Sequence, residues 1–206
     1  GALTRNLGRK FYTDSCIKPY PCCRGTHAAI DCALALVQKH GIRPEEIEAV
    51  TLLLPPQGLG SFVARPFALG EFPQADVLFS CRYTVAVALL RGSVVPEHFA
   101  PAAVADPQVG ALATGMELAA LEEGRRAAAG LRVRLKDGRE YVEYAAVPRG
   151  DRFSNPLTET EVWEKFSRNL SFGGADPAKG GEIWSAVQAM EQVSQVAGVV
   201  EALAVV

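Results

Sequence analysis

The sequence predicts an α+β domain in which a mixed or antiparallel sheet packs against helices. Helical and strand patterns are mixed along the 206 residues without the regular βαβ repeat of a parallel fold. Residues 131–144 alternate apolar and charged side chains around Asp137-Gly138, a pair that favours a hairpin with a type I′ turn. No internal repeat or low-complexity linker interrupts the chain, so residues 1–206 are expected to form one domain.

The first half of the chain contributes most of the predicted helices. An apolar repeat that ends at Gly41 predicts a helix opening after Thr26, which can cap it. The stretch at 76–91 is apolar almost all round, as in a buried helix. The other elements expected here are an extended segment at 9–17, a single turn at 44–46, a strand at 48–54, a loop at 56–75 and a helix at 107–122.

After the hairpin, the sequence predicts two more helices. Thr158 and Glu161 form a capping box, which opens the first of them. A glycine-rich gap at 173–181 separates it from a last helix that runs from about 182 to near the end. The apolar tail and the helix at 76–91 predict an exposed apolar face and self-association, hence a homo-oligomer.

Composition excludes several classes of function. A net charge of -2 disfavours nucleic acid and anionic membranes as partners, since both need a basic excess. No run of about 18 uncharged apolar residues predicts a membrane span. The five cysteines form an odd, clustered set, which suits free thiols and a cytoplasmic protein.

The most informative stretch is KPYPCCRGTH at 18–27, which gathers cationic groups just before a helix. A helix N-terminus carries unpaired N–H groups and about half a positive charge. Lys18 and Arg24 add positive charge, Gly25 allows close approach to the backbone, and His27 can move a proton. The segment therefore predicts a site for small carboxylates, with two prolines to stiffen it.

Other interpretations of this stretch stay open at the level of sequence. Lys18 and Arg24 could be solvated while His27 packs or caps. The cysteine spacing lacks the pair typical of zinc, so no metal is expected, and small buried thiols are favoured over a catalytic one. Arg82 and Tyr83 are the large polar groups of the apolar helix, and Arg82 needs an anionic partner or a cleft.

Five stretches resemble the MmgE/PrpD family, which includes 2-methylcitrate dehydratase, cis-aconitate decarboxylase and iminodisuccinate epimerase. The resemblance covers nearly the whole chain. In order, they are KPYPCCRGTHAAID (18–31), FSCRYTVAVALLRG (79–92), LKDGRE (135–140), PRGD (148–151) and NPLTETEVWEKF (155–166). The chain resembles the family's smaller C-terminal domain, which implies a chorismate-mutase-like arrangement and a helical N-terminal domain absent from this chain.

The resemblance implies a lyase that dehydrates 2-methylcitrate or a related di- or tricarboxylate without a cofactor. It implies Lys18 and His27 as catalytic residues, beside the candidate substrate-binding residues Arg24, Gly25, Thr26, Arg82 and Tyr83. Decarboxylases of the family place a histidine five positions after the lysine, where this chain has Cys23. Alternatives are an epimerase or decarboxylase of the family, or a non-catalytic carboxylate-binding or interaction domain. Because further catalytic groups belong to the N-terminal domain, the chain alone is expected to be inactive.

Overall fold

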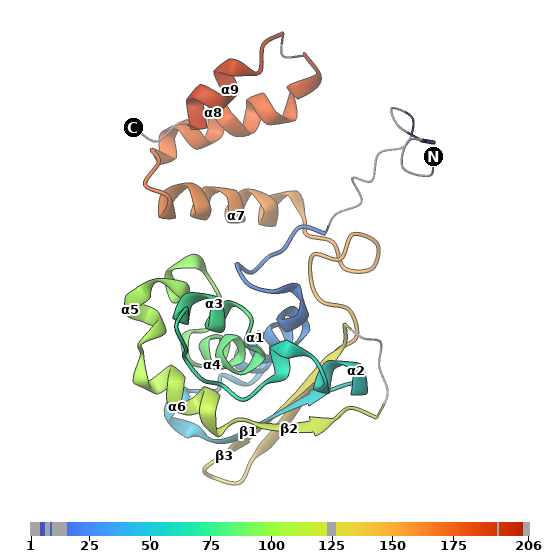
Figure 1. Ribbon diagram of the computed structural model, residues 1–206, viewed down its shortest axis with the longest axis vertical. Coiled ribbons are helices and arrows are strands. Elements are labelled where there is room, and N and C mark those ends of the chain that lie inside the picture. Colours follow the sequence, from blue (N-terminus) through green and yellow to red (C-terminus); the bar gives the residue numbers. More distant parts are fainter. Residues whose placement is uncertain (1–4, 7–8, 10–15, 123–126, 193, 204–206) are drawn as a thin grey trace.

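A four-stranded mixed sheet with strand order β2-β1-β3-β4 forms the base of the molecule (Figure 1). The computed structural model describes residues 5–6, 9, 16–122, 127–192 and 194–203. Strand β1 pairs in parallel with β2 and antiparallel with β3, and β3 pairs antiparallel with β4. The strands are β1 (Ile47–Leu54), β2 (Glu117–Ala120), β3 (Ala129–Leu135) and β4 (Glu140–Ala145). The predicted α+β class is confirmed.

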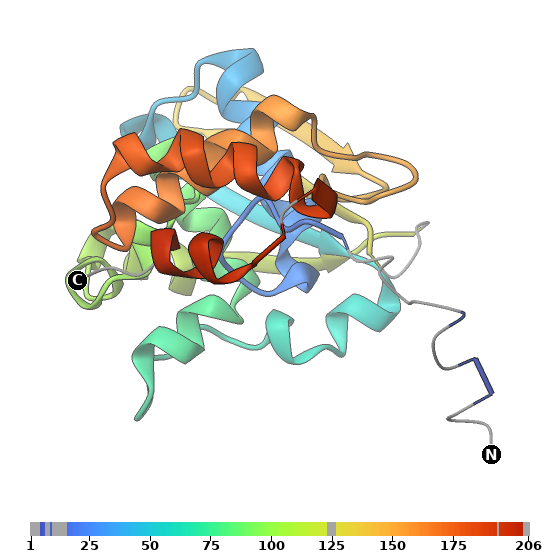
Figure 2. The ribbon, with the colours of Figure 1, turned by 90° about the horizontal axis from the view of Figure 1, so that it is seen from above.

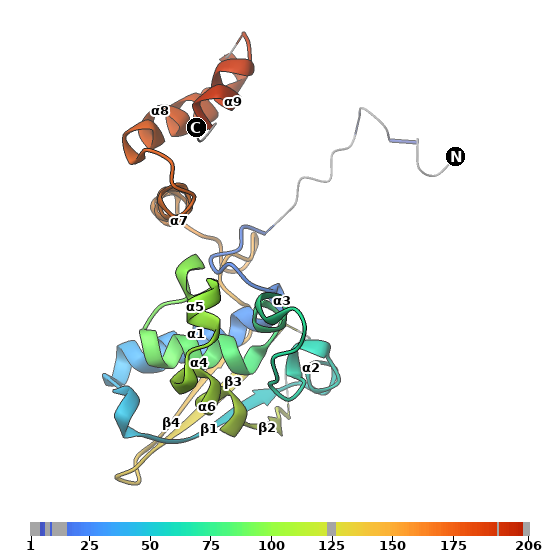
Figure 3. The same cartoon turned by 60° about the vertical axis from the view of Figure 1, so that its left-hand side comes forward.

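Helices cover one face of this sheet, with α1 packed on β3, β4 and α4 (Figures 1 and 3). The core between them is apolar: Ile30, Leu52, Val85 and Leu131 are fully buried. The described helices of this body are α1 (His27–His40), α2 (Pro56–Leu59), α3 (Pro73–Leu78), α4 (Cys81–Arg91), α5 (Pro101–Val104) and α6 (Pro107–Gly115). Short 3₁₀ turns lie at Arg24–Thr26, Pro44–Glu46, Phe62–Ala64 and Pro96–Phe99.

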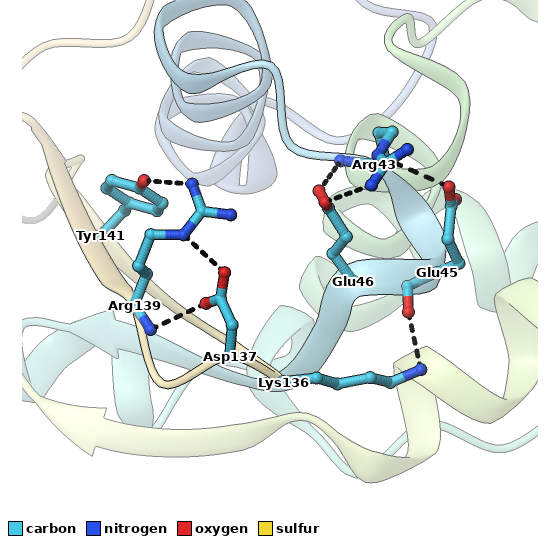
Figure 4. Close-up of polar contacts among 7 residues, drawn as sticks. All are labelled: Arg43, Glu45, Glu46, Lys136, Asp137, Arg139 and Tyr141. Atoms are coloured by element: carbon cyan, nitrogen blue, oxygen red, sulfur yellow. Dashed lines mark hydrogen bonds and ion pairs between the residues drawn. The ribbon is translucent and has the colours of Figure 1, made fainter.

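The predicted hairpin is confirmed, but its predicted type I′ turn is wrong. A type I′ turn needs positive φ at both central residues, and only Gly138 has it, at 88°. The Gly138 N–H donates to the Leu135 carbonyl and the Leu135 N–H to the Arg139 carbonyl, which defines a three-residue loop. Figure 4 shows the side chains that hold it: Asp137 accepts from Arg139, and Lys136 donates to the Glu45 carbonyl.

Two predicted helices are shorter than expected. The stretch at 76–91 breaks at residues 79–80, and the Ser80 hydroxyl caps the new helix α4 by accepting from the Tyr83 N–H. Helix α6 ends at Gly115, and residues 117–120 continue as β2 rather than as helix. The predicted loop at 56–75 contains short helical turns. Most of the predicted extended segment at 9–17 lies outside the described residues.

The last described helices are α7 (Glu159–Phe172), α8 (Pro177–Gln188) and α9 (Ala197–Leu203), which stand apart from the sheet (Figure 1) and overlie the rest of the molecule when it is seen from above (Figure 2). The predicted capping box is present, with mutual bonds between Thr158 and Glu161. The predicted last helix is broken into two. Trp163 and Trp184 meet edge to face at 5.3 Å, which ties α7 to α8.

Candidate functional site

The segment before α1 is fixed by contacts at both ends. The Cys23 N–H donates to the Leu78 carbonyl at 2.9 Å, which holds it against the turn before α4. On the other side, Gly150 has a φ of 80°, and a Cβ there would lie 2.1 Å from the Ile17 carbonyl oxygen. The PRGD turn can therefore approach the backbone beside Lys18 only because residue 150 is glycine.

Arg24 also binds the PRGD turn at 148–151. Its guanidinium donates to the backbone carbonyls of Pro148, at 3.1 Å, and Arg149. It also lies 3.3 Å from His27 Nδ1. These contacts use the fork that was predicted to hold a carboxylate, so the substrate-binding role of Arg24 stays a prediction.

His27 is fully buried at the first position of α1. Since the Arg24 guanidinium can only donate, Nδ1 accepts from it, and Nε2 carries the proton toward the Cys22 carbonyl at 3.4 Å. Burial, and then the nearby Arg24 charge, lower the pKa of His27 to about 4. His27 is therefore neutral at pH 7, and the proton transfer expected of it stays a prediction.

Asp31, one turn further along α1, is the residue that sequence reasoning missed. It accepts from the Tyr20 hydroxyl at 2.6 Å and from the Arg149 N–H at 2.7 Å. Burial raises the pKa of Asp31, although these hydrogen bonds oppose the rise. The Tyr20 ring in turn meets the His27 ring edge to face at 5.0 Å. The available signal was a lone carboxylate on the otherwise apolar face of the predicted helix.

Lys18 differs from these residues because its side chain is exposed and has no ion pair or hydrogen bond with a described residue. It lines a cavity of about 370 Å³ together with Cys23, Phe79 and Lys165 of α7. This volume lies in the range of about 300–1,000 Å³ typical of small-ligand sites. A cation in such a place can attract a carboxylate.

Neither of the neighbouring candidates, Gly25 and Thr26, shows a feature specific to a binding site. Gly25 is exposed, and a Cβ there would make ordinary contact with Val63 at 3.5 Å, so its glycine is not needed for space. The buried Thr26 hydroxyl makes no cap hydrogen bond to the helix, contrary to the predicted cap, and instead donates to the Cys23 carbonyl at 2.9 Å.

The two candidates on α4 lie in different surroundings. Tyr83 is buried between Phe67 and Phe99, and its hydroxyl donates to the His98 carbonyl at 2.8 Å. Its contacts are thus with the core and not with the segment at 16–27. Arg82 is half-buried, and its buried Nε has no hydrogen-bond partner among the described residues. Their substrate-binding roles stay predictions.

The cysteines are free thiols. Cys22, Cys32 and Cys81 are buried, as expected, but Cys16 is exposed and Cys23 only half-buried, contrary to that expectation. Burial raises the pKa of the Cys22 thiol to about 11. Within the described ranges, no cluster of histidine, cysteine and carboxylate side chains could hold a metal ion. None of the described helices has the length and apolarity that a bilayer crossing requires.

The fold and site define a class: an α+β domain in which the segment before α1 presents a lysine, without a partner among the described residues, to a surface cavity. Comparison with known families assigns it further. The model of the MmgE/PrpD C-terminal domain matches residues 20–191, and the chain therefore belongs to this family. Family membership implies association with the family's N-terminal domain. A search of curated proteins found no significant match.

Proposed function

We propose that this domain supplies the cationic, carboxylate-binding half of a lyase active site that dehydrates 2-methylcitrate or a related small tricarboxylate. One observation carries the proposal: Lys18 is exposed beside a cavity and unpaired among the described residues, while the backbone around it is pinned on both sides. Membership of the MmgE/PrpD family supports the reaction class.

In the proposed reaction, a base on the family's N-terminal domain removes a proton from the carbon next to a carboxylate. The electron pair of the broken C–H bond forms the C=C bond, and hydroxide departs from the adjacent carbon and takes a proton to become water. Negative charge builds on the carboxylate oxygens as the C–H bond breaks. The Lys18 ammonium stabilises this charge more in the transition state than in the ground state.

Three residues near Lys18 have a positioning role in this proposal. Arg24 and Asp31 bind the 148–150 turn, and that turn packs closely against the backbone at Ile17. Neutral His27 accepts a hydrogen bond from Arg24. A rigid backbone limits the conformational freedom that Lys18 loses when it binds a carboxylate.

Cys23 favours dehydration over decarboxylation among the family's reactions. The family's decarboxylases are expected to have a histidine at this position, and here a half-buried thiol lines the cavity with Lys18. An imidazole could carry a proton near neutral pH to the carbon that loses CO₂, and this chain has no imidazole at that position. An epimerase would use the same carbanion and is the second candidate.

The test is proton NMR of the two-domain protein incubated with 2-methylcitrate in heavy water. We expect new resonances of an unsaturated tricarboxylate, and none with the 206-residue chain alone. A two-domain protein that binds 2-methylcitrate but leaves its spectrum unchanged would contradict the dehydratase, and deuterium exchange without a new product would indicate epimerase chemistry.

A further inference from the structure

We propose that Lys165, on α7, is a second carboxylate anchor that makes the Lys18 cavity selective for substrates with two or more carboxylates. This inference deepens the proposed function and rests on it. Lys165 lies in the NPLTETEVWEKF stretch, which the sequence analysis used to predict a helix and not a binding residue. The structure brings its side chain to the cavity of about 370 Å³ that Lys18 lines.

No described carboxylate is paired with Lys165. Glu161, four residues earlier on α7, is the natural partner of a lysine at this position. Instead, Glu161 pairs with Arg149 of the PRGD turn. Glu164 is exposed and lines, together with Glu161 and Lys165, a neighbouring cavity, but it forms no ion pair with Lys165. As a result, Lys165 forms no ion pair or hydrogen bond with any residue that the structure describes.

The lining of the cavity also favours an anion. Two lysines line it from distant parts of the chain, one from the segment before α1 and one from α7. Among the described residues no carboxylate lines it, and its other walls are Tyr20 and apolar or thiol groups such as Leu78, Phe79 and Cys23. Two like charges that share a small cavity repel each other, so an anion that binds both relieves this repulsion. A monocarboxylate can satisfy one ammonium, whereas a tricarboxylate can satisfy both.

The helix gives Lys165 a defined place. Helix α7 is held to α8 by the Trp163–Trp184 contact and to the body by the Arg149–Glu161 pair. Arg149 also donates its N–H to Asp31, which links α7 to α1. The same PRGD turn therefore positions both lysines.

The experiment titrates the 206-residue chain with tricarballylate and with propionate at low ionic strength, followed by calorimetry or by NMR shifts. The variants are Lys165→Met, Lys18→Met and the control Lys179→Met, which replaces an exposed lysine of α8. We expect Lys165→Met to weaken tricarballylate binding about tenfold and to leave propionate binding unchanged, because a hydrogen-bonded ion pair contributes about that much. Lys165→Arg is expected to keep most of the affinity.

The outcomes separate the two proposals. If Lys165→Met binds tricarballylate as tightly as the parent chain, or if the parent chain does not prefer tricarballylate to propionate, the second anchor is overturned. If Lys18→Met leaves both ligands bound while Lys165→Met loses tricarballylate, the Lys18 half-site of the proposed function fails and Lys165 stands. Circular dichroism checks that each variant is folded.

Discussion

Two groups of polar side chains near the start of α1 differ in their partners. In the partnered group, Arg24, His27 and Asp31 each have a partner in the protein. In the unpartnered group, the exposed Lys18 and the half-buried Lys165 of α7 have none among the described residues. Within the motif at 18–27, Arg24 and His27 therefore bind the protein itself, whereas Lys18 remains available to a ligand. The charges of these residues do not distinguish the two groups, whereas their hydrogen bonds and ion pairs within the protein do.

The largest expected effect comes from Gly150→Ala, which breaks the link between the two groups. The new Cβ would lie 2.1 Å from the Ile17 carbonyl oxygen, so the segment that carries Lys18 must move. We expect a loss of about 3 kcal/mol in the free energy of unfolding, measured by urea denaturation, and loss of carboxylate binding.

Gly174→Ala is the matched control, because Gly174 has the same φ of 80° but nothing within 4 Å of the added Cβ. It should cost only about 1 kcal/mol, the strain of the backbone conformation. Equal losses in the two variants would show that the contact with Ile17 is unimportant.

Arg24→Met tests the partnered group directly. It leaves the carbonyls of Pro148 and Arg149 without their donor, and Pro148 is buried. We expect a destabilisation of about 2 kcal/mol in urea denaturation. Arg65→Met, at an exposed position, should change stability by less than about 0.5 kcal/mol. If the Arg24 variant is as stable as the Arg65 variant, the hydrogen bonds of Arg24 do not stabilise the fold.

His27→Gln is expected to change how stability depends on pH. The pKa of His27 falls from its ordinary 6.5 to about 4 in the folded chain. Between these values the unfolded chain binds a proton that the folded chain does not, so stability falls as pH falls. This term amounts to about 2 kcal/mol between pH 7 and pH 5.

Urea denaturation at these two pH values measures the term, and the glutamine variant should lose less stability than the parent over this range. His40→Gln replaces an exposed histidine and should keep the parent's pH dependence. An unchanged pH dependence in His27→Gln would mean that His27 is protonated in the folded chain.

Local signals predicted the parts of the fold that depend on neighbours in sequence. The end of α1 at Gly41, with a φ of 60°, and the capping box of Thr158 follow from backbone and side-chain chemistry within a few residues. Strand β2 was missed because a short ELAA stretch carries no strand signal, and its pairing with β1 is long-range.

The site shows the same division. The position of Lys18 before a helix was visible in the sequence, but the partner of Asp31 is 118 residues away, at Arg149. Nothing local could show that the Arg24 fork is occupied by backbone carbonyls or that Lys165 reaches the cavity of Lys18. These hydrogen bonds and ion pairs depend on tertiary contacts, so only the structure could show which residues of the motif are partnered.

The central claim is that Lys18 binds a ligand while Arg24 holds the scaffold. The most direct test measures the free energy of unfolding and the tricarballylate affinity of Lys18→Met and Arg24→Met in the same buffer. The account predicts that Lys18→Met keeps its stability within about 0.5 kcal/mol and loses at least about tenfold in affinity, whereas Arg24→Met is destabilised. A Lys18→Met variant that is destabilised and still binds tricarballylate would contradict the account.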